Sequence, residues 1–175
     1  MLLLAACTEV EPPAQQEVSD SPVQTTYEYH TTQTQAGVPV WELWGSSAQR
    51  FADDPLLHLS EVRMLFFREG DKDATLTSRS GEVDENSYDT VARGDVVVVT
   101  EDGRILRSEI LYWDNARELI HTDQFVHFTD GDQVLTGYGL ETDPNLTNLV
   151  ILDQVSGSAI AGTGGETTGN GKEQP

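Results

Sequence analysis

The side chains of this sequence best suited to chemistry are one cysteine, two nearby histidines and two pairs of aspartates. Cys7 is the only cysteine, so neither an internal disulfide nor a multi-thiolate metal site can form within the chain. His121 and His127 have no further ligands converging on them in the sequence, which favours exposed strand histidines over a metal site. We therefore expect no metal ion and no cofactor.

The aspartate pairs suit acid–base or calcium chemistry, but their positions favour a structural role. They are Asp71/Asp73 and Asp130/Asp132. Both pairs lie beside glycines in predicted turns, where aspartate is favoured because its carboxylate accepts backbone hydrogen bonds. The ligand spacing of an EF-hand is missing, and so is the Gly-x-Ser-x-Gly motif of a nucleophilic serine. We predict that the protein is not an enzyme; a glycosidase built on a carboxylate pair is the remaining catalytic alternative.

The charge balance excludes several classes of partner. Ten Lys and Arg residues against thirty Asp and Glu give the 175-residue chain a net charge of −20. A nucleic-acid-binding surface needs a basic stripe that displaces counterions from phosphates, so we expect no nucleic-acid partner. The same excess of carboxylates argues against electrostatic adhesion to an anionic membrane. No run of about twenty apolar residues occurs, so the sequence predicts no transmembrane helix.

The chain begins with a short apolar run, which ends in a lipobox-like pattern, Leu4-Ala5-Ala6-Cys7. A complete signal also has a basic start and about 7–15 apolar residues, so we interpret residues 1–7 as a truncated lipoprotein signal. The alternative is a chance apolar start with a free thiol. Several acyl chains on Cys7 would anchor the protein stably. We expect a periplasmic protein held at the inner membrane by lipidated Cys7, although the residues after Cys7 leave the choice of membrane open.

Composition divides the rest of the chain into three segments. Residues 8–35 are rich in Glu, Pro, Gln, Ser and Thr and bury too little apolar surface to fold, so we expect a disordered tether there. Residues 156–175 form a Gly- and Thr-rich tail that we also expect to be disordered. One folded domain remains, over residues 36–155.

Alternation of apolar and other residues predicts β-strands in that domain, as at Val62, Met64 and Phe66. Turn signals separate the runs at Glu69-Gly70-Asp71, Asp102-Gly103, Asp130-Gly131-Asp132 and Asp143-Pro144-Asn145. Asp-Gly between apolar runs favours a hairpin, because glycine tolerates the positive φ of the turn. We expect no long helix, while a helical turn within residues 86–93 or 115–119 stays open.

Three segments of this region align as an internal repeat. The leading residues are Leu76, Leu106 and Leu135, which are 30 and 29 residues apart. Repeats of this length are typical of stacked supersecondary units that share a core. Short antiparallel strands stacked without closure leave two open edges, which favour pairing with similar sheets.

A small residue follows two positions after each leading leucine, at Ser78, Ser108 and Gly137. It leaves room for a close sheet contact or for a ligand. Leu111 and Leu140 follow five positions after their leading leucines and are therefore out of phase. Either both faces of the sheet are partly buried, or a bulge shifts the alternation, and Gly137 and Gly139 suit a bulge.

Residues 102–143 carry a longer pattern. It consists of the Asp102-Gly103 turn, the strand Leu106-Arg107-Ser108-Glu109-Ile110-Leu111-Tyr112-Trp113-Asp114, the step Thr122-Asp123 and the closing Gly137-Tyr138-Gly139-Leu140-Glu141-Thr142-Asp143. With its flanks, over about residues 41–152, it resembles the LptC family of periplasmic lipopolysaccharide-export proteins. The resemblance implies an all-β fold, a twisted antiparallel β-jelly roll of the OstA-like type, built of stacked hairpin repeats and open at both ends.

The resemblance also implies a function without catalysis. A member of this family receives the acyl chains of lipopolysaccharide from an inner-membrane ABC transporter in a hydrophobic groove. It passes them to a second OstA-like jelly roll, which pairs with an edge strand. Members of the family carry an N-terminal transmembrane helix, whereas this chain has the lipobox remnant, so a lipid anchor on Cys7 would replace that helix as the tether.

Burying acyl chains is worth about 0.8 kcal/mol per CH₂, so an apolar groove is sufficient for this transport. Nine apolar residues are our candidates for its lining: Val62, Met64, Phe66, Val97, Val99, Leu111, Trp113, Phe125 and Leu140. The alternative is that these residues are ordinary core. The protein would then be a non-transporting β-scaffold or a ligand-binding lipoprotein with the same architecture.

Overall fold

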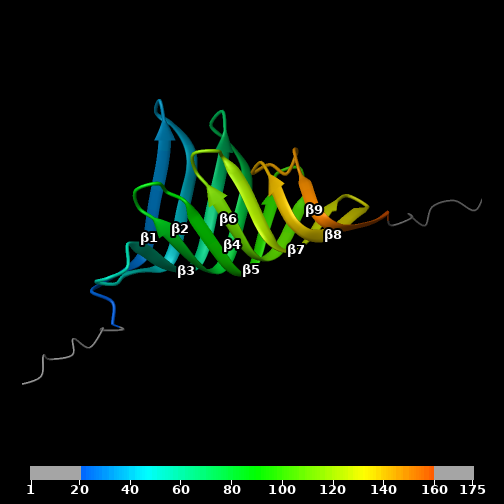
Figure 1. Ribbon diagram of the computed structural model, residues 1–175. Coiled ribbons are helices and arrows are strands. Elements are labelled where there is room, and N and C mark those ends of the chain that lie inside the picture. Colours follow the sequence, from blue (N-terminus) through cyan, green and yellow to red (C-terminus); the bar gives the residue numbers. More distant parts are fainter. Residues whose placement is uncertain (1–20, 160–175) are drawn as a thin grey trace, which may run out of the picture.

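The computed structural model describes residues 21–159, which form one antiparallel β-sheet of nine strands (Figure 1). The strands are β1 (Gln24–Gln35), β2 (Val38–Arg50), β3 (Leu56–Arg68), β4 (Asp71–Asp84), β5 (Thr90–Thr100), β6 (Ile105–Asp114), β7 (Leu119–Asp130), β8 (Gln133–Thr142) and β9 (Val150–Ala159). Each strand pairs with the next one along the chain, so β1 and β9 form opposite edges and the sheet is not closed. The prediction of an all-β jelly-roll-like fold is confirmed.

The predicted turn signals connect the strands. Gly70, Gly103 and Gly131 have positive φ in the β3–β4, β5–β6 and β7–β8 turns, which is the conformation that glycine adopts without strain. Residues 85–87 and 115–118 form turns rather than a helix. The described part of the chain contains no helix at all.

Most strands carry a β-bulge near their middle. The register shifts in β4, β5, β6, β7 and β8, and along β6 both Leu106 and Leu111 are buried although they are five residues apart. A bulge adds a residue to one strand and thereby shifts which side chains face inward. Of the two explanations for the out-of-phase leucines, the bulge is therefore the one that the structure supports.

The small residues of the repeat lie on this line of bulges. Ser78, Ser108 and Gly137 each stand at or beside the register shift of their strand. A Cβ atom on Gly137 would lie 2.5 Å from Ile151 Cγ2 and 2.7 Å from the Asp153 backbone oxygen, closer than any side chain allows. At Gly137 the missing side chain thus permits a close contact between β8 and β9.

The bulges bend the sheet, so that its two halves face each other across an apolar interior (Figure 1). The rings of Phe66 on β3 and Trp113 on β6 lie 4.9 Å apart. These strands are three positions apart in the sheet, which in a flat sheet would separate them by about 14 Å. Trp41 on β2 likewise contacts Tyr88, in the loop between β4 and β5. The buried core is therefore the space inside the folded sheet.

Two domain boundaries differ from the prediction. Residues 24–35, expected in the disordered tether, form β1 and pair along β2, and residues 156–159, expected in the tail, pair with β8. Both segments are polar because they are edge strands whose side chains are mostly exposed, so hydrophobic alternation does not mark them. The interpretation of residues 1–7, the tether over residues 8–20 and the tail beyond residue 159 fall outside the described residues.

Candidate functional site

The interior of the folded sheet contains six of the nine predicted groove residues. All six are at most 4% exposed and belong to one continuous apolar cluster. They are Val62, Met64, Phe66, Leu111, Trp113 and Leu140. They come from β3, β6 and β8, and the bend at the bulges brings them together.

The other three candidates lie on the outer face of the sheet. Val99 is 41% and Phe125 48% exposed, and Val97 is half-buried. The corresponding inward positions are occupied by Val96, Val98 and Val126, which are fully buried. The prediction that Val97, Val99 and Phe125 face the interior is therefore wrong. Four consecutive valines on β5 give no contrast between the faces, so the sequence alone could not fix which of them point inward.

Phe125 and Val97 belong to a separate outer surface. They line a hollow of about 340 Å³ together with Arg107 and His127. The ring of Phe125 also contacts Tyr138 on β8, with ring centroids 5.3 Å apart. Lipid held inside the folded sheet would not touch this outer surface.

The apolar interior ends at a seam, where the end of β3 and the start of β4 lie opposite the loop between β8 and β9. A cavity of about 370 Å³ lies in this seam. We call it the seam cavity. Its apolar walls are Val40, Phe66, Phe67, Trp113 and Pro144, and its polar residues are Arg68, Asp73, Glu118, Asp143, Asn145, Thr147 and Asn148. Because Phe66 and Trp113 also belong to the core cluster, the cavity borders the apolar interior.

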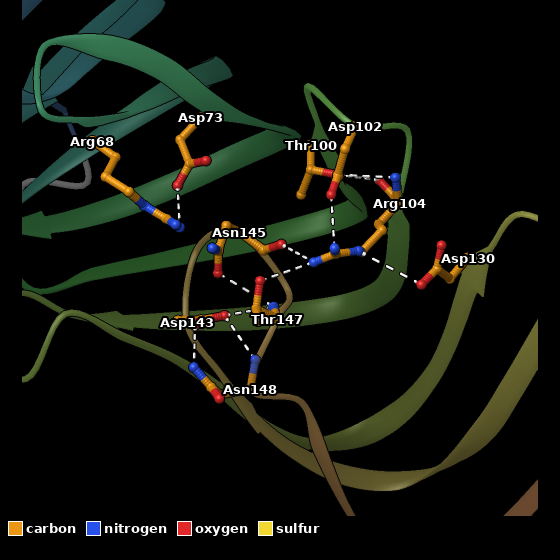
Figure 2. Close-up of polar contacts among 10 residues, drawn as sticks. All are labelled: Arg68, Asp73, Thr100, Asp102, Arg104, Asp130, Asp143, Asn145, Thr147 and Asn148. Carbon is orange, nitrogen blue, oxygen red and sulfur yellow. Dashed lines mark hydrogen bonds and ion pairs between the residues drawn. The ribbon is translucent and has the colours of Figure 1, made fainter.

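The loop between β8 and β9, residues 143–149, fills the seam beside this cavity (Figure 2). Leu146 at its tip is 2% exposed and packs into the core with a φ of 56°. The Asp143 carboxylate accepts hydrogen bonds from the Thr147 amide at 2.8 Å and from the Asn148 side chain at 2.7 Å. The loop is therefore a compact plug built around one carboxylate.

Arg104 connects this plug to the opposite side of the seam (Figure 2). From the β5–β6 turn it donates to the Asn145 carbonyl at 3.1 Å and to the Thr147 hydroxyl at 2.9 Å. Its guanidinium also pairs with Asp102 at 2.7 Å and approaches Asp130 to 3.6 Å. The Thr100 hydroxyl and then Arg104 lower the pKa of Asp102, because both stabilise its charged form.

The two inward tryptophans differ in how their indole N–H groups are bonded. Trp41 Nε1 donates to Asn115 Oδ1 at 2.9 Å, whereas Trp113 Nε1 is covered and has no acceptor among the described residues. In the sequence, Trp113 stands out only as an apolar candidate for the groove. Nothing in the sequence indicates that its N–H group lacks a partner, because that depends on contacts across the folded sheet.

The residues considered for acid–base or metal chemistry do not gather at one place. Asp73 pairs with Arg68 at 2.7 Å in the seam, and Asp130 lies 3.6 Å from Arg104, so one carboxylate of each pair is engaged by an arginine. His121 stacks on Tyr112 on the outer face, with ring centroids 5.2 Å apart. Within residues 21–159 no group of three or more His, Cys, Asp or Glu side chains is arranged to hold a metal ion.

Comparison with known proteins identifies the family. A family model described as "Lipopolysaccharide-assembly, LptC-related" matches residues 1–160, which is most of the chain. No curated protein matches the sequence. Among the described residues, none forms a helix long and apolar enough to cross a membrane. The open, folded β-sheet and the family match agree with the resemblance found in residues 102–143, and the chain belongs to the LptC-related family of lipopolysaccharide-assembly proteins.

Proposed function

We propose that this protein carries lipopolysaccharide across the periplasm without catalysis, with the acyl chains held inside the folded sheet. The observation that carries this proposal is the seam cavity, whose floor, Phe66 and Trp113, is part of the apolar core. An amphiphile can place its chains in such an interior while its headgroup stays in solvent. Transfer of each CH₂ group from water contributes about 0.8 kcal/mol, so no chemical step is needed for binding.

The two edges of the sheet suit partners of the same architecture. In the described part of the chain β1 pairs only with β2, and β9 only with β8, so each edge offers unpaired backbone groups. Exposed apolar side chains stand along β9, namely Val150, Leu152 and Val155. An incoming strand would pair with the backbone of β9 and cover part of this apolar surface.

The order of the strands suggests which partner meets which edge. Figure 1 shows β1 and β9 at opposite ends of the molecule. A lipid anchor on Cys7 would tether the β1 edge rather than the β9 edge to the inner membrane, because β1 is the strand that follows Cys7 first along the chain, after residues 8–23. In this proposal the β1 edge faces an inner-membrane ABC transporter, and the β9 edge pairs with a second, OstA-like jelly roll.

Photocrosslinking in cells tests the proposal with two phenylalanines as a matched pair. Phe66 points into the interior and is 3% exposed, whereas Phe125 is on the outer face. Each is replaced in turn with the photoreactive analogue benzoylphenylalanine, and adducts are detected with an antibody against lipopolysaccharide. We expect a lipopolysaccharide adduct that depends on ATP from position 66 and none from position 125.

A protein that folds and still pairs with its partner, but gives no lipopolysaccharide adduct at position 66, would contradict the proposal. The interior would then be ordinary core. That result would favour the alternative of a β-scaffold or ligand-binding lipoprotein with the same architecture.

A further inference from the structure

Trp113 presents a buried hydrogen-bond donor without an acceptor. Its side chain is 4% exposed, and its Nε1 atom has no partner among the described residues. Leaving such a group unpaired costs free energy, and buried polar groups in native proteins are nearly always bonded. Trp41, on the facing half of the sheet, shows the usual arrangement, because Asn115 accepts its N–H group at 2.9 Å. Trp113 therefore differs from Trp41, and the unpaired donor calls for a physical explanation.

The position of Trp113 beside two cavities provides an explanation for its unpaired N–H group. Its ring lines the seam cavity of about 370 Å³ and also a second cavity of about 220 Å³, which is lined by Tyr112 and His121 among others. The seam cavity falls within the range of about 300–1,000 Å³ typical of ligand pockets. The unpaired donor thus belongs to a side chain that forms the wall of a space large enough for part of a ligand.

The charges around the seam cavity indicate which acceptor fits. Three carboxylates, from Asp73, Glu118 and Asp143, line it together with one guanidinium, from Arg68, which is already paired with Asp73 at 2.7 Å. A phosphate in this cavity would face a net negative surround, which disfavours it. A neutral oxygen avoids that repulsion and still accepts a hydrogen bond from the indole.

The apolar walls indicate what such an oxygen is attached to. Val40, Phe67 and Pro144 surround the cavity, and Phe66 packs against the Trp113 ring with centroids 4.9 Å apart. A hydrocarbon chain fits this surface, and its linkage to a headgroup would lie where the apolar walls give way to the polar rim. The neutral oxygen at that point of an acylated lipid is the carbonyl of the ester or amide linkage.

We infer that the seam cavity recognises the carbonyl of an acyl linkage and that Trp113 Nε1 donates the hydrogen bond to it. The inference rests on the proposed function, since it specifies which part of the lipid the interior selects. Trp113 Nε1 is covered in the structure, so the carbonyl reaches it when the ring turns toward the cavity as a chain enters. Trp113 is then a specificity residue, which distinguishes acyl lipids from lipids that lack a carbonyl.

A pair of uncharged lipids tests the inference on the purified full chain. Monolauroylglycerol and the matched dodecyl glycerol ether have the same headgroup and chain length, but only the ester has a carbonyl. Binding is measured by fluorescence or calorimetry below the concentration at which either lipid forms micelles. We expect the wild-type protein to bind the ester about three- to tenfold more tightly than the ether, as one additional hydrogen bond predicts.

Substitution of the two tryptophans provides the matched variants. Trp113→Phe keeps an aromatic ring in the wall and removes the donor, so it should bind ester and ether equally. Trp41→Phe removes a donor that is already bonded inside the protein and should keep the preference for the ester. A preference that survives in Trp113→Phe, or that is absent in the wild type, overturns the inference and leaves the groove proposal intact. Failure of both lipids to bind overturns both.

A measurement on the unaltered protein does not depend on how the variants fold. The chain has three tryptophans, so its nitrogen–proton NMR spectrum contains three indole cross-peaks. Addition of the ester should shift the Trp113 indole proton downfield, as formation of a hydrogen bond predicts, and the ether should leave it nearly unchanged. Equal shifts with both lipids would contradict the assigned donor.

Discussion

Arg104 donates a hydrogen bond to the backbone carbonyl of Asn145, 41 residues further along the chain, at 3.1 Å. This contact bridges the seam between the β5–β6 turn and the plug formed by residues 143–149 (Figure 2). Thr147 lines the seam cavity on one side of the plug and a cavity of about 270 Å³ on the other, which Arg104 and Leu146 also line. The plug therefore separates two hollows of the seam, and Arg104 connects it to the opposite side.

Removing the Arg104 side chain should loosen the plug. Arg104→Ala deletes two hydrogen bonds from a charged donor, so we expect a loss of about 1–3 kcal/mol in the free energy of unfolding. Denaturant unfolding measures this loss, and hydrogen exchange should show faster exchange at the amides of Leu146 and Thr147. Arg107→Ala, three residues further along on β6, is the matched control, because Arg107 is exposed on the outer face. An equal effect of the two variants would contradict the role given to Arg104.

Leu146 should contribute to stability as a core residue although it belongs to a loop. It is 2% exposed and packs into the apolar cluster. Leu146→Ala removes buried methyl groups and leaves a cavity, so we expect a cost of about 2–5 kcal/mol in the free energy of unfolding. Leu152→Ala on β9, where the side chain is exposed, should cost far less. Similar midpoints of chemical unfolding for both variants would show that the plug is not packed as described.

Gly137 should be irreplaceable for the pairing of β8 with β9. A Cβ atom there would lie 2.5 Å from Ile151 Cγ2 and 2.7 Å from a backbone oxygen, so Gly137→Ala must push β9 away. We expect rapid hydrogen exchange in β9 and weaker pairing with a partner at this edge. Gly103→Ala is the control: its Cβ would meet no atom within 4 Å, and it adds only the strain of a positive φ, about 1–2 kcal/mol. Unchanged exchange in β9 of Gly137→Ala would contradict the close contact.

The strands and turns could be predicted because local signals specify them. Alternation in β3 is regular over Val62, Met64 and Phe66, and Asp-Gly turns end β5 and β7 where they were expected. Where the local signal is weak, the prediction was wrong. β1 lacks apolar alternation because it is an edge strand, and Val97 and Val99 were assigned to the inner face because four consecutive valines do not distinguish the two faces.

The candidate site could be predicted only in part, because it depends on contacts between distant strands. Six of the nine residues predicted to line the groove lie in the interior, where the ring of Phe66 contacts that of Trp113. The seam cavity, the plug with Leu146 and the link through Arg104 come from segments that only the bend of the sheet brings together. The repeat did contain one relevant signal: Ser78, Ser108 and Gly137 stand along the line where the sheet bends.

Asp102 should make the stability of the plug region depend on pH. The Thr100 hydroxyl and the Arg104 guanidinium lower the pKa of Asp102 below its ordinary value of 3.8. A carboxyl group whose pKa is lower in the folded state stabilises the fold above its unfolded pKa. This contribution is lost as the pH falls through the folded pKa, because protonation then removes the favoured charge.

The free energy of unfolding of the wild-type protein should therefore exceed that of Asp102→Asn at neutral pH, and the difference should shrink below pH 3.8. Denaturant unfolding across this pH range measures the difference, with Asp132→Asn in the neighbouring turn as the control for net charge. A difference between wild type and Asp102→Asn that stays constant through the acid range would contradict the link between Asp102 and Arg104.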